Sequence, residues 1–328
     1  MADKVATTEP SGLAGIRRIN IGTSATLMVI VVILFVFLSM TSPVFLTGAN
    51  LSNLLRQTSI NGIIALGMLM VIITAGIDLS VGAVVAIAGI VNALMLQAGV
   101  PMLVSIPLTI VIGAIIGMFN GFLVFEVRIT PFIASLGTLT IVRGLVMIIS
   151  GARMVANLPV EFGRIASAEL LGIPSMFIVW MVLFVLTAFL LSYTQIGRNF
   201  FIIGSSTEVA RLSGIRLRPN IYAVYGLCSA YAALAGILLS ARLSMGVPTA
   251  GISYELDAIA AVVIGGGSLF GAAGSAFGAV LGAIIMQTIR NGGNLLGVDP
   301  FALEVIIGAL ILIAVGVDQI RVRRAERG

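Results

Sequence analysis

Five polar or charged residues stand inside or beside long apolar stretches of this sequence, where such side chains are rare. They are Asp78, Ser80, Asn120, Arg143 and Asp257. A charged group within a membrane is costly, and by default it marks a transport path, a gate or a buried ion pair. We therefore expect these five residues to lie along a translocation path.

Structural roles compete for three of these residues. Asp78 precedes an apolar run and could cap a helix by accepting a hydrogen bond from a backbone N–H. Asn120, near the end of another run, could bridge two helices through hydrogen bonds. Arg143 lies within a run, so it should meet a carboxylate, with Asp257 or Glu304 as candidates, or face a cavity.

The sequence contains few of the residue types on which catalysis most often depends. It has no histidine, one lysine (Lys4) and one cysteine (Cys228). The commonest general base and metal ligand is therefore missing, and neither an internal disulfide nor a multi-thiolate metal site can form. A phosphate-binding P-loop needs a lysine in its glycine-rich turn, so this chain cannot hydrolyse ATP by that route. We expect no catalytic residue, no metal site and no cofactor in this chain.

One long polar segment, residues 193–220, interrupts the apolar pattern. Within it, Ser205 and Glu208 have the spacing of a capping box, in which each side chain satisfies the other's free backbone N–H. Gly214 is placed to end a helix in the left-handed conformation. These signals predict a short helix between Ser205 and Gly214.

The predicted short helix has an apolar face formed by Val209 and Leu212, which Ile215 continues. So few turns are not stable alone in water. The helix must therefore pack either against the membrane part of its own chain or into a groove on a cytoplasmic partner, as amphipathic helices do.

Composition indicates an all-α polytopic membrane protein. Hydrophobic residues make up 59% of the 328 residues and charged residues only 9%, against roughly 25% charged in soluble domains. Mean hydropathy is +1.18. The 38 glycines suit membrane helices that pack closely or break. The net charge of +5 comes from basic residues spread over short loops and tails, so it does not indicate nucleic-acid binding.

Ten apolar stretches are candidate transmembrane helices, each needing about 20 residues to span a bilayer. Two of them, Ile60–Thr74 and Leu256–Phe270, look short. They are either broken helices beside a transport path or stretches with misplaced boundaries. The ten predicted spans are Thr23–Met40, Ile60–Thr74, Val81–Gln97, Leu103–Phe125, Ile133–Ser150, Ile173–Ser192, Ile221–Leu243, Leu256–Phe270, Ala272–Ile289 and Phe301–Val317.

The distribution of basic residues predicts the orientation. With the N-terminus in the cytoplasm, twelve Lys and Arg residues fall inside and five outside, as the positive-inside rule requires. Both termini are then cytoplasmic. The predicted organisation is a cytoplasmic tail over residues 1–22, a transmembrane domain over 23–317 that includes the loop 193–220, and a basic cytoplasmic tail over 318–328.

Two stretches share a pattern that hints at an internal duplication. Val71–Gly82 (VIITAGIDLSVG) and Val262–Gly274 (VVIGGGSLFGAAG) each consist of an apolar run, a glycine-containing turn and a second apolar run.

The long polar loop resembles the coupling loop of ABC importer permeases of the ribose/monosaccharide type. The resemblance rests on GRNFFIIGSSTEVARLSGI (Gly197–Ile215), and further motifs in the family's order extend it along most of the chain. These motifs are ITAGIDLSVG at the end of Ser59–Gly82, GMFNG (Gly117–Gly121), TPFIASLGTLTIVRG (Thr130–Gly144), PTAGISYELDAIAAVVIGGGSLFGAAG (Pro248–Gly274) and NGGNLLGV (Asn291–Val298).

The resemblance implies the rest of a transport machine. Two permeases, identical or paralogous, would pair in a bacterial inner membrane above separate ABC ATPase subunits that bind ATP and Mg²⁺. A periplasmic binding protein would deliver a pentose or hexose, and nucleic acid would play no part. The coupling residues carried over are Gly197, Arg198, Gly204, Ser205, Glu208, Val209, Ala210, Arg211, Leu212, Ser213, Gly214 and Ile215.

An ion-coupled secondary transporter is the main alternative. Asp78, Asp257 and Glu304 are few and lie near span ends, which is a poor fit to a carboxylate relay. The sequence also shows no cluster of Asn, Asp, Gln and aromatic residues typical of a tight sugar site. We therefore expect a weakly polar path, with affinity residing in the binding protein.

Overall fold

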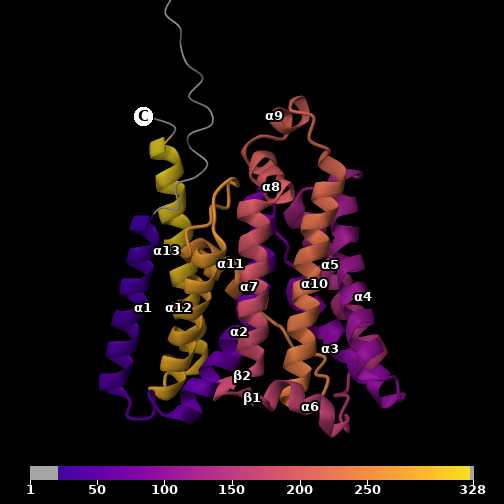
Figure 1. The fold of residues 1–328 in the computed structure, drawn as a ribbon, viewed down its shortest axis with the longest axis vertical. Helices are drawn as coiled ribbons and strands as arrows, with labels where there is room; N and C mark the ends of the chain where they lie inside the picture. Colours follow the sequence, from indigo (N-terminus) through magenta and orange to yellow (C-terminus); the bar gives the residue numbers. More distant parts are fainter. Residues whose placement is uncertain (1–20, 326–328) are drawn as a thin grey trace, which may run out of the picture.

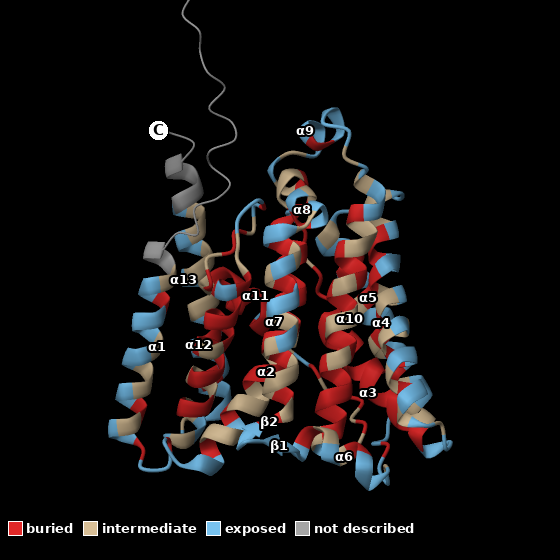
Figure 2. Cartoon of the chain, viewed as in Figure 1, coloured by how far each residue is buried: buried red, intermediate tan, exposed pale blue. Residues whose placement is uncertain are grey.

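The computed structural model describes residues 21–325 and shows a bundle of helices around a buried centre (Figure 1). Three helices form this centre, and their buried faces are almost wholly apolar. Figure 2 shows many buried residues along these three helices, and also along the segments 254–264 and 276–295. The central helices are α2 (Gly48–Ile73), α3 (Val81–Gln97) and α10 (Leu217–Leu243).

Five long helices surround the centre and turn apolar side chains outward. Leu103 and Leu312, for example, are exposed. Seven described helices, counting α2 and α10, are long and apolar enough to cross a membrane, so outward leucines face lipid rather than water. The chain is a polytopic membrane protein. The surrounding helices are α1 (Ile21–Thr41), α4 (Met102–Phe125), α5 (Pro131–Ser150), α7 (Ser175–Tyr193) and α13 (Pro300–Ala325).

The two short predicted spans have different outcomes. The first is a boundary error, because α2 begins at Gly48 and its early turns hold polar residues that hydropathy excluded. The second is a truly short helix, α11 (Tyr254–Ile264), which ends at the glycines that follow it. The next span is displaced toward the C-terminus and forms α12 (Ala276–Leu295).

Both ends of the bundle contain short elements, of which only the short helix in the loop 193–220 was predicted. One end of the bundle has α6 (Val160–Ser167) and an antiparallel hairpin of β1 (Glu169–Leu170) and β2 (Ile173–Pro174). The opposite end has α8 (Gln195–Ser205) and α9 (Thr207–Leu212) (Figure 1).

The predicted C-terminal tail begins within a helix, because α13 continues through residue 318 to Ala325. The N-terminal boundary is also shifted, since α1 begins at Ile21. The rest of the predicted N-terminal tail and residues 326–328 lie outside the described residues.

Helices α4 and α10 touch through a stripe of glycines. A Cβ atom added at Gly117 would lie 2.1 Å from the Tyr225 carbonyl oxygen, and one added at Gly113 would lie 2.5 Å from the Ala233 Cβ. Gly121 continues the stripe, with its added Cβ 3.1 Å from a backbone atom of α10. Small residues at four-residue spacing allow membrane helices to approach this closely. The glycines therefore fix how α4 lies against the centre.

Candidate functional site

The short helix α9 begins one residue later than the sequence predicted. The Ser206 hydroxyl accepts the cap hydrogen bond from the Val209 N–H at 3.2 Å, whereas the Ser205 hydroxyl donates to the Ile202 carbonyl at 2.8 Å. The predicted capping box of Ser205 and Glu208 is therefore wrong. The reason is that α8 runs through Ser205 and leaves the next residue to cap α9.

The end of α9 is as predicted. Gly214 has a φ of 76°, and its N–H donates to the Arg211 carbonyl at 3.0 Å. The Ile215 N–H reaches back to the Ala210 carbonyl, also at 3.0 Å. This pair of bonds is the Schellman motif, and the left-handed conformation that it needs suits glycine.

The apolar face of α9 is uncovered. Val209 is 53% exposed and Leu212 is 77% exposed, whereas Ala210 is buried against the rest of the chain. Glu208 and Arg211 form an exposed ion pair at 2.9 Å beside this face. Packing against its own chain therefore buries Ala210 and leaves two apolar side chains of the helix largely exposed.

Helix α8 lies between α9 and the membrane bundle and contacts backbone at both of its ends. A Cβ at Gly197 would lie 2.2 Å from the Leu190 carbonyl oxygen. A Cβ at Gly204 would lie 1.8 Å from the Ile73 carbonyl oxygen and 2.8 Å from the Ala272 nitrogen. Arg198 stays on the exposed side, where it binds Gln195 at 2.8 Å.

The two stretches of the suspected duplication meet beside Gly204. The Ala272 N–H donates to the Ile73 carbonyl at 2.9 Å, which joins the loop after α11 to the end of α2. The same loop is held to α13, because Asp318 accepts hydrogen bonds from the Ser268 hydroxyl at 3.0 Å and the Leu269 N–H at 3.2 Å. Helix α8 therefore rests on both turns at once.

Replacing Ser206 by alanine should loosen the first turn of α9, whereas Ser205→Ala should not. Losing an N-cap hydroxyl costs about 1 kcal/mol, and only Ser206 supplies one here. Hydrogen exchange at the Val209 amide measures the effect, with several-fold faster exchange expected for Ser206→Ala. Faster exchange at this amide in Ser205→Ala than in Ser206→Ala would instead support the predicted capping box.

Three of the predicted path residues form one buried cluster. The Asp78 Oδ1 accepts hydrogen bonds from the Ser80 N–H at 2.9 Å, the Ser80 hydroxyl at 2.6 Å and the Asn120 Nδ2 at 3.2 Å. Asn120 also donates to the Ser80 hydroxyl at 2.9 Å. All three side chains are fully buried. In this conformation the cluster joins the turn before α3 to α4 and does not line an open path.

The structure shows which of the roles considered above Asp78 and Asn120 have. Asn120 bridges two segments, as predicted. Asp78 accepts the Ser80 N–H just before α3, as the predicted cap requires, although Ser80 itself is the residue that immediately precedes the helix. The same carboxylate fixes the turn between α2 and α3 from within.

Neither candidate carboxylate, Asp257 or Glu304, forms an ion pair with Arg143 among the described residues. The Arg143 Nη1 donates to the carbonyls of Ala250 at 2.6 Å and Pro248 at 3.4 Å, and Asp257 binds Arg290 at 2.6 Å instead. The physical reason is that residues 245–251 connect α10 to α11 without regular structure. Their carbonyls are therefore free to take the place of a carboxylate.

A set of amide side chains that sequence reasoning missed joins α2 to α12. Gln287 donates to Gln57 at 2.6 Å and accepts from Asn61 at 2.9 Å. One turn further along, Asn50 and Asn291 exchange hydrogen bonds at 3.2 and 2.9 Å. The four-residue spacings 57–61 and 287–291 were a signal that each helix has a polar stripe. The amides therefore gather between these two helices, although their hydrogen bonds include no aromatic side chain of the kind expected in a tight sugar site.

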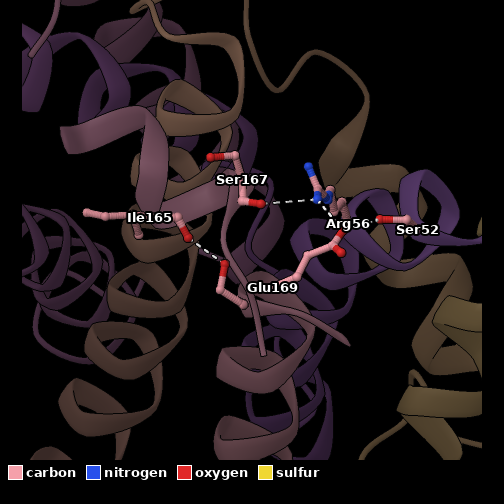
Figure 3. Close-up of polar contacts among 6 residues, drawn as sticks. Ser52, Arg56, Ile165, Ser167 and Glu169 are labelled. Carbon is pink, nitrogen blue, oxygen red and sulfur yellow. Dashed lines mark hydrogen bonds and ion pairs between the residues drawn. The ribbon is translucent and has the colours of Figure 1, made fainter. Parts of the chain in front are cut away.

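The hairpin end of the bundle is anchored to the start of α2. Figure 3 shows Arg56 contacting Glu169 at 2.8 Å and the Ser167 carbonyl at 3.3 Å, with Ser52 donating to Glu169 at 3.1 Å. Ser175 donates to the Ile165 carbonyl. Arg56 lies within α2, in its third turn. Within residues 21–325, no group of three or more His, Cys, Asp or Glu side chains could hold a metal ion.

The fold defines a polytopic membrane protein, and comparison with known proteins identifies its family. Residues 50–315 match the family described as the permease component of branched-chain amino acid transport systems, and the chain belongs to this family. The match confirms the resemblance to ABC importer permeases.

Individual relatives cover most of the chain. A ribose import permease of Bacillus subtilis is 43% identical over 88% of this chain and 90% of its own length. A D-allose transport permease of Escherichia coli is 36% identical over 90% of this chain and 91% of its own length. A xylose transport permease of the same organism is 32% identical over 98% of each chain. No solved structure matches.

Proposed function

We propose that this chain is the permease subunit of an ATP-driven importer for a monosaccharide, a ribose-like pentose or a hexose. Relatives at 32–43% identity that cover nearly the whole chain carry ribose, allose and xylose in their names, which supports this solute class. The observation that carries the proposal is the uncovered apolar face of α9, since a transporter that worked alone would not expose it to water.

The proposed coupling surface comprises α8 and α9. Val209 and Leu212 dock into a groove on a separate ATPase that binds ATP and Mg²⁺, in the helix-in-groove mode. Glu208 and Arg211 flank them and set the register of docking. Gly197 and Gly204 transmit the movement, because their backbones lie against the membrane helices with no side chain between.

In the proposed topology the end with α9 is cytoplasmic, since basic residues favour that side. Helix α1 begins and α13 ends on the same side as α9 (Figure 1). The proposed topology has ten membrane crossings. They are the seven long apolar helices, α3, α12, and one broken crossing formed by residues 245–251 together with α11. A periplasmic binding protein docks at the opposite end, and a second permease, identical or paralogous, completes the path.

The proposed gate lies where segments of irregular backbone meet the helix bundle. In transporters, broken helices of this kind typically stand beside the transport path. At the cytoplasmic side, Asp78, Ser80 and Asn120 hold the turn between α2 and α3. Arg143 holds the segment before α11 through its carbonyls, and Asp257 holds α11 itself through Arg290. Movement of α8 reaches both turns through Gly204.

Replacing Leu212 by aspartate should abolish stimulation of the ATPase by solute. The experiment reconstitutes the permease with its binding protein and ATPase in liposomes, and measures sugar-dependent ATP hydrolysis and uptake. A loss of about tenfold or more is expected, which corresponds to ~1.4 kcal/mol of docking energy. Leu212→Met keeps the apolar surface and is the matched control, with near wild-type activity expected.

The same experiment separates the two classes of transporter. Uptake that follows an ion gradient, needs no ATP and ignores Leu212→Asp would establish a secondary transporter and refute the importer. ATP-dependent uptake that Leu212→Asp leaves intact would keep the importer but remove α9 from the coupling surface.

A further inference from the structure

Two sets of polar contacts, one between α2 and α12 and one between α12 and α11, adjoin along α12 and are here called together the α2–α12 polar cluster. Its members are Gln57, Asn61, Gln287, Arg290 and Asp257. Gln287 contacts both α2 amides, and Arg290, one turn further along α12, binds Asp257 of α11 at 2.6 Å. Residues far apart in the sequence therefore bring amide, guanidinium and carboxylate groups together.

The cluster is reached from the end of the bundle opposite α9. Gln57 follows Arg56, which binds the hairpin at that end (Figure 3). In the same region Arg242, in the last turn of α10, donates to Asn53 at 2.7 Å. Gln57, Asn61 and Arg290 are only half-buried, whereas Gln287 and Asp257 are buried. The cluster therefore has a buried part, formed by Gln287 and Asp257. Its rim, formed by Gln57, Asn61 and Arg290, is partly accessible.

Hydrogen bonding within the cluster is incomplete. Among the described residues, the buried atoms Asn61 Oδ1 and Arg290 Nε have no partner. Unsatisfied polar groups at membrane depth are costly, so a new hydrogen-bond partner for these two atoms would be favourable. An amide has two donors and one acceptor, and Arg has donors only, so the rim offers both kinds of hydrogen bond.

A neighbouring amide pair shows what a purely structural contact looks like in this protein. Asn50 and Asn291 join the same two helices, are both buried, and exchange reciprocal hydrogen bonds. Asn50 also donates to the Phe45 carbonyl at 2.8 Å. This pair suffices to hold α2 against α12 at that level. The half-exposed, incompletely satisfied cluster next to it differs in both respects.

We propose that the α2–α12 polar cluster is a low-affinity contact site for a polyhydroxylated solute in the outer half of the translocation path. The inference rests on the proposed function and adds the place where solute is recognised. Neighbouring hydroxyls of a sugar both donate and accept hydrogen bonds, which matches an amide pair beside a guanidinium. Incomplete enclosure keeps binding weak, as release into the path requires.

The test is the preference among sugars in the reconstituted complex. Uptake of D-ribose, D-xylose and D-allose is measured at saturating binding protein for wild type, Gln57→Asn and Asn61→Ser. Gln57→Asn shortens the side chain by one methylene group and so draws the amide back toward α2. Because the amide itself is kept, the fold is expected to survive. Gln97→Asn, the same change at the outer end of α3, is the matched control. We expect a shift of about fivefold in the ratio of sugar uptakes for either cluster variant, the effect of one lost hydrogen bond.

The outcomes separate the inference from the function on which it rests. An altered sugar ratio in a cluster variant, with unchanged thermal stability and wild-type behaviour of Gln97→Asn, supports the site. Unchanged ratios with lowered thermal stability would make the cluster structural and overturn the inference, although the importer stands. Wild-type protein that takes up none of the three sugars would contradict the proposed function itself.

Discussion

Replacing Gly117 by leucine is expected to prevent assembly of the native helix bundle. Even the first side-chain carbon would lie 2.1 Å from the Tyr225 carbonyl oxygen and 2.7 Å from the Ser229 Cβ. Overpacking a core costs about 1–3 kcal/mol when side chains can move. Here one obstacle is backbone, so α4 itself must move away from α10. We expect the cost to reach or exceed the upper end of that range.

The measurement is the yield of monodisperse protein in detergent, together with its thermal unfolding temperature. Gly308→Leu on α13 is the control, since nothing among the described residues lies within 4 Å of the Cβ built there. Gly308→Leu should leave yield and unfolding temperature near wild type. Equal behaviour of the two variants would show that α4 and α10 do not pack as described.

Replacing Gly204 by valine is expected to disconnect α8 from the bundle while the bundle still folds. The added Cβ would overlap the Ile73 carbonyl oxygen at 1.8 Å, so the bond from the Ala272 N–H to that oxygen must break or α8 must move. Helix α8 is not among the seven long apolar helices. The membrane fold should therefore tolerate the change better than it tolerates Gly117→Leu.

The functional loss should nevertheless be large. If α9 docks on the ATPase, α8 is the segment through which movement reaches the end of α2 and the loop after α11. Sugar-stimulated ATP hydrolysis in liposomes should fall by about tenfold or more, ~1.4 kcal/mol, with basal hydrolysis retained. Gly137→Val on α5, where nothing lies within 4 Å of the added Cβ among the described residues, is the control. Full stimulation in Gly204→Val would refute this route of coupling.

Much of this protein could be predicted from its sequence because the deciding forces are local or compositional. The scarcity of charges requires a lipid-facing surface whatever the packing, so membrane residence did not depend on tertiary structure. Helix α3 has the predicted bounds Val81–Gln97, since an apolar run between two turns fixes both ends. Gly214 ends α9 in the predicted conformation because the left-handed backbone is a property of the residue itself.

Small errors arose where two local signals compete. Ser205 and Ser206 are both good N-cap residues, and only the continuation of α8 decides between them. Helix α2 begins 12 residues before the predicted span, which hydropathy placed at Ile60. Its polar turns find partners on α12 and the hairpin, which no window of adjacent residues can reveal.

The sequence by itself therefore determined that the chain is a polytopic membrane protein, to which family it belongs, and where its short polar-loop helix ends. Only the tertiary structure decided which polar groups meet. Arg143 takes backbone carbonyls instead of Asp257, and Gln57 and Asn61 reach Gln287 across more than 220 residues of chain. The physical reason is that a hydrogen-bond partner is fixed by how helices pack, and close backbone approaches such as that at Gly204 set this packing.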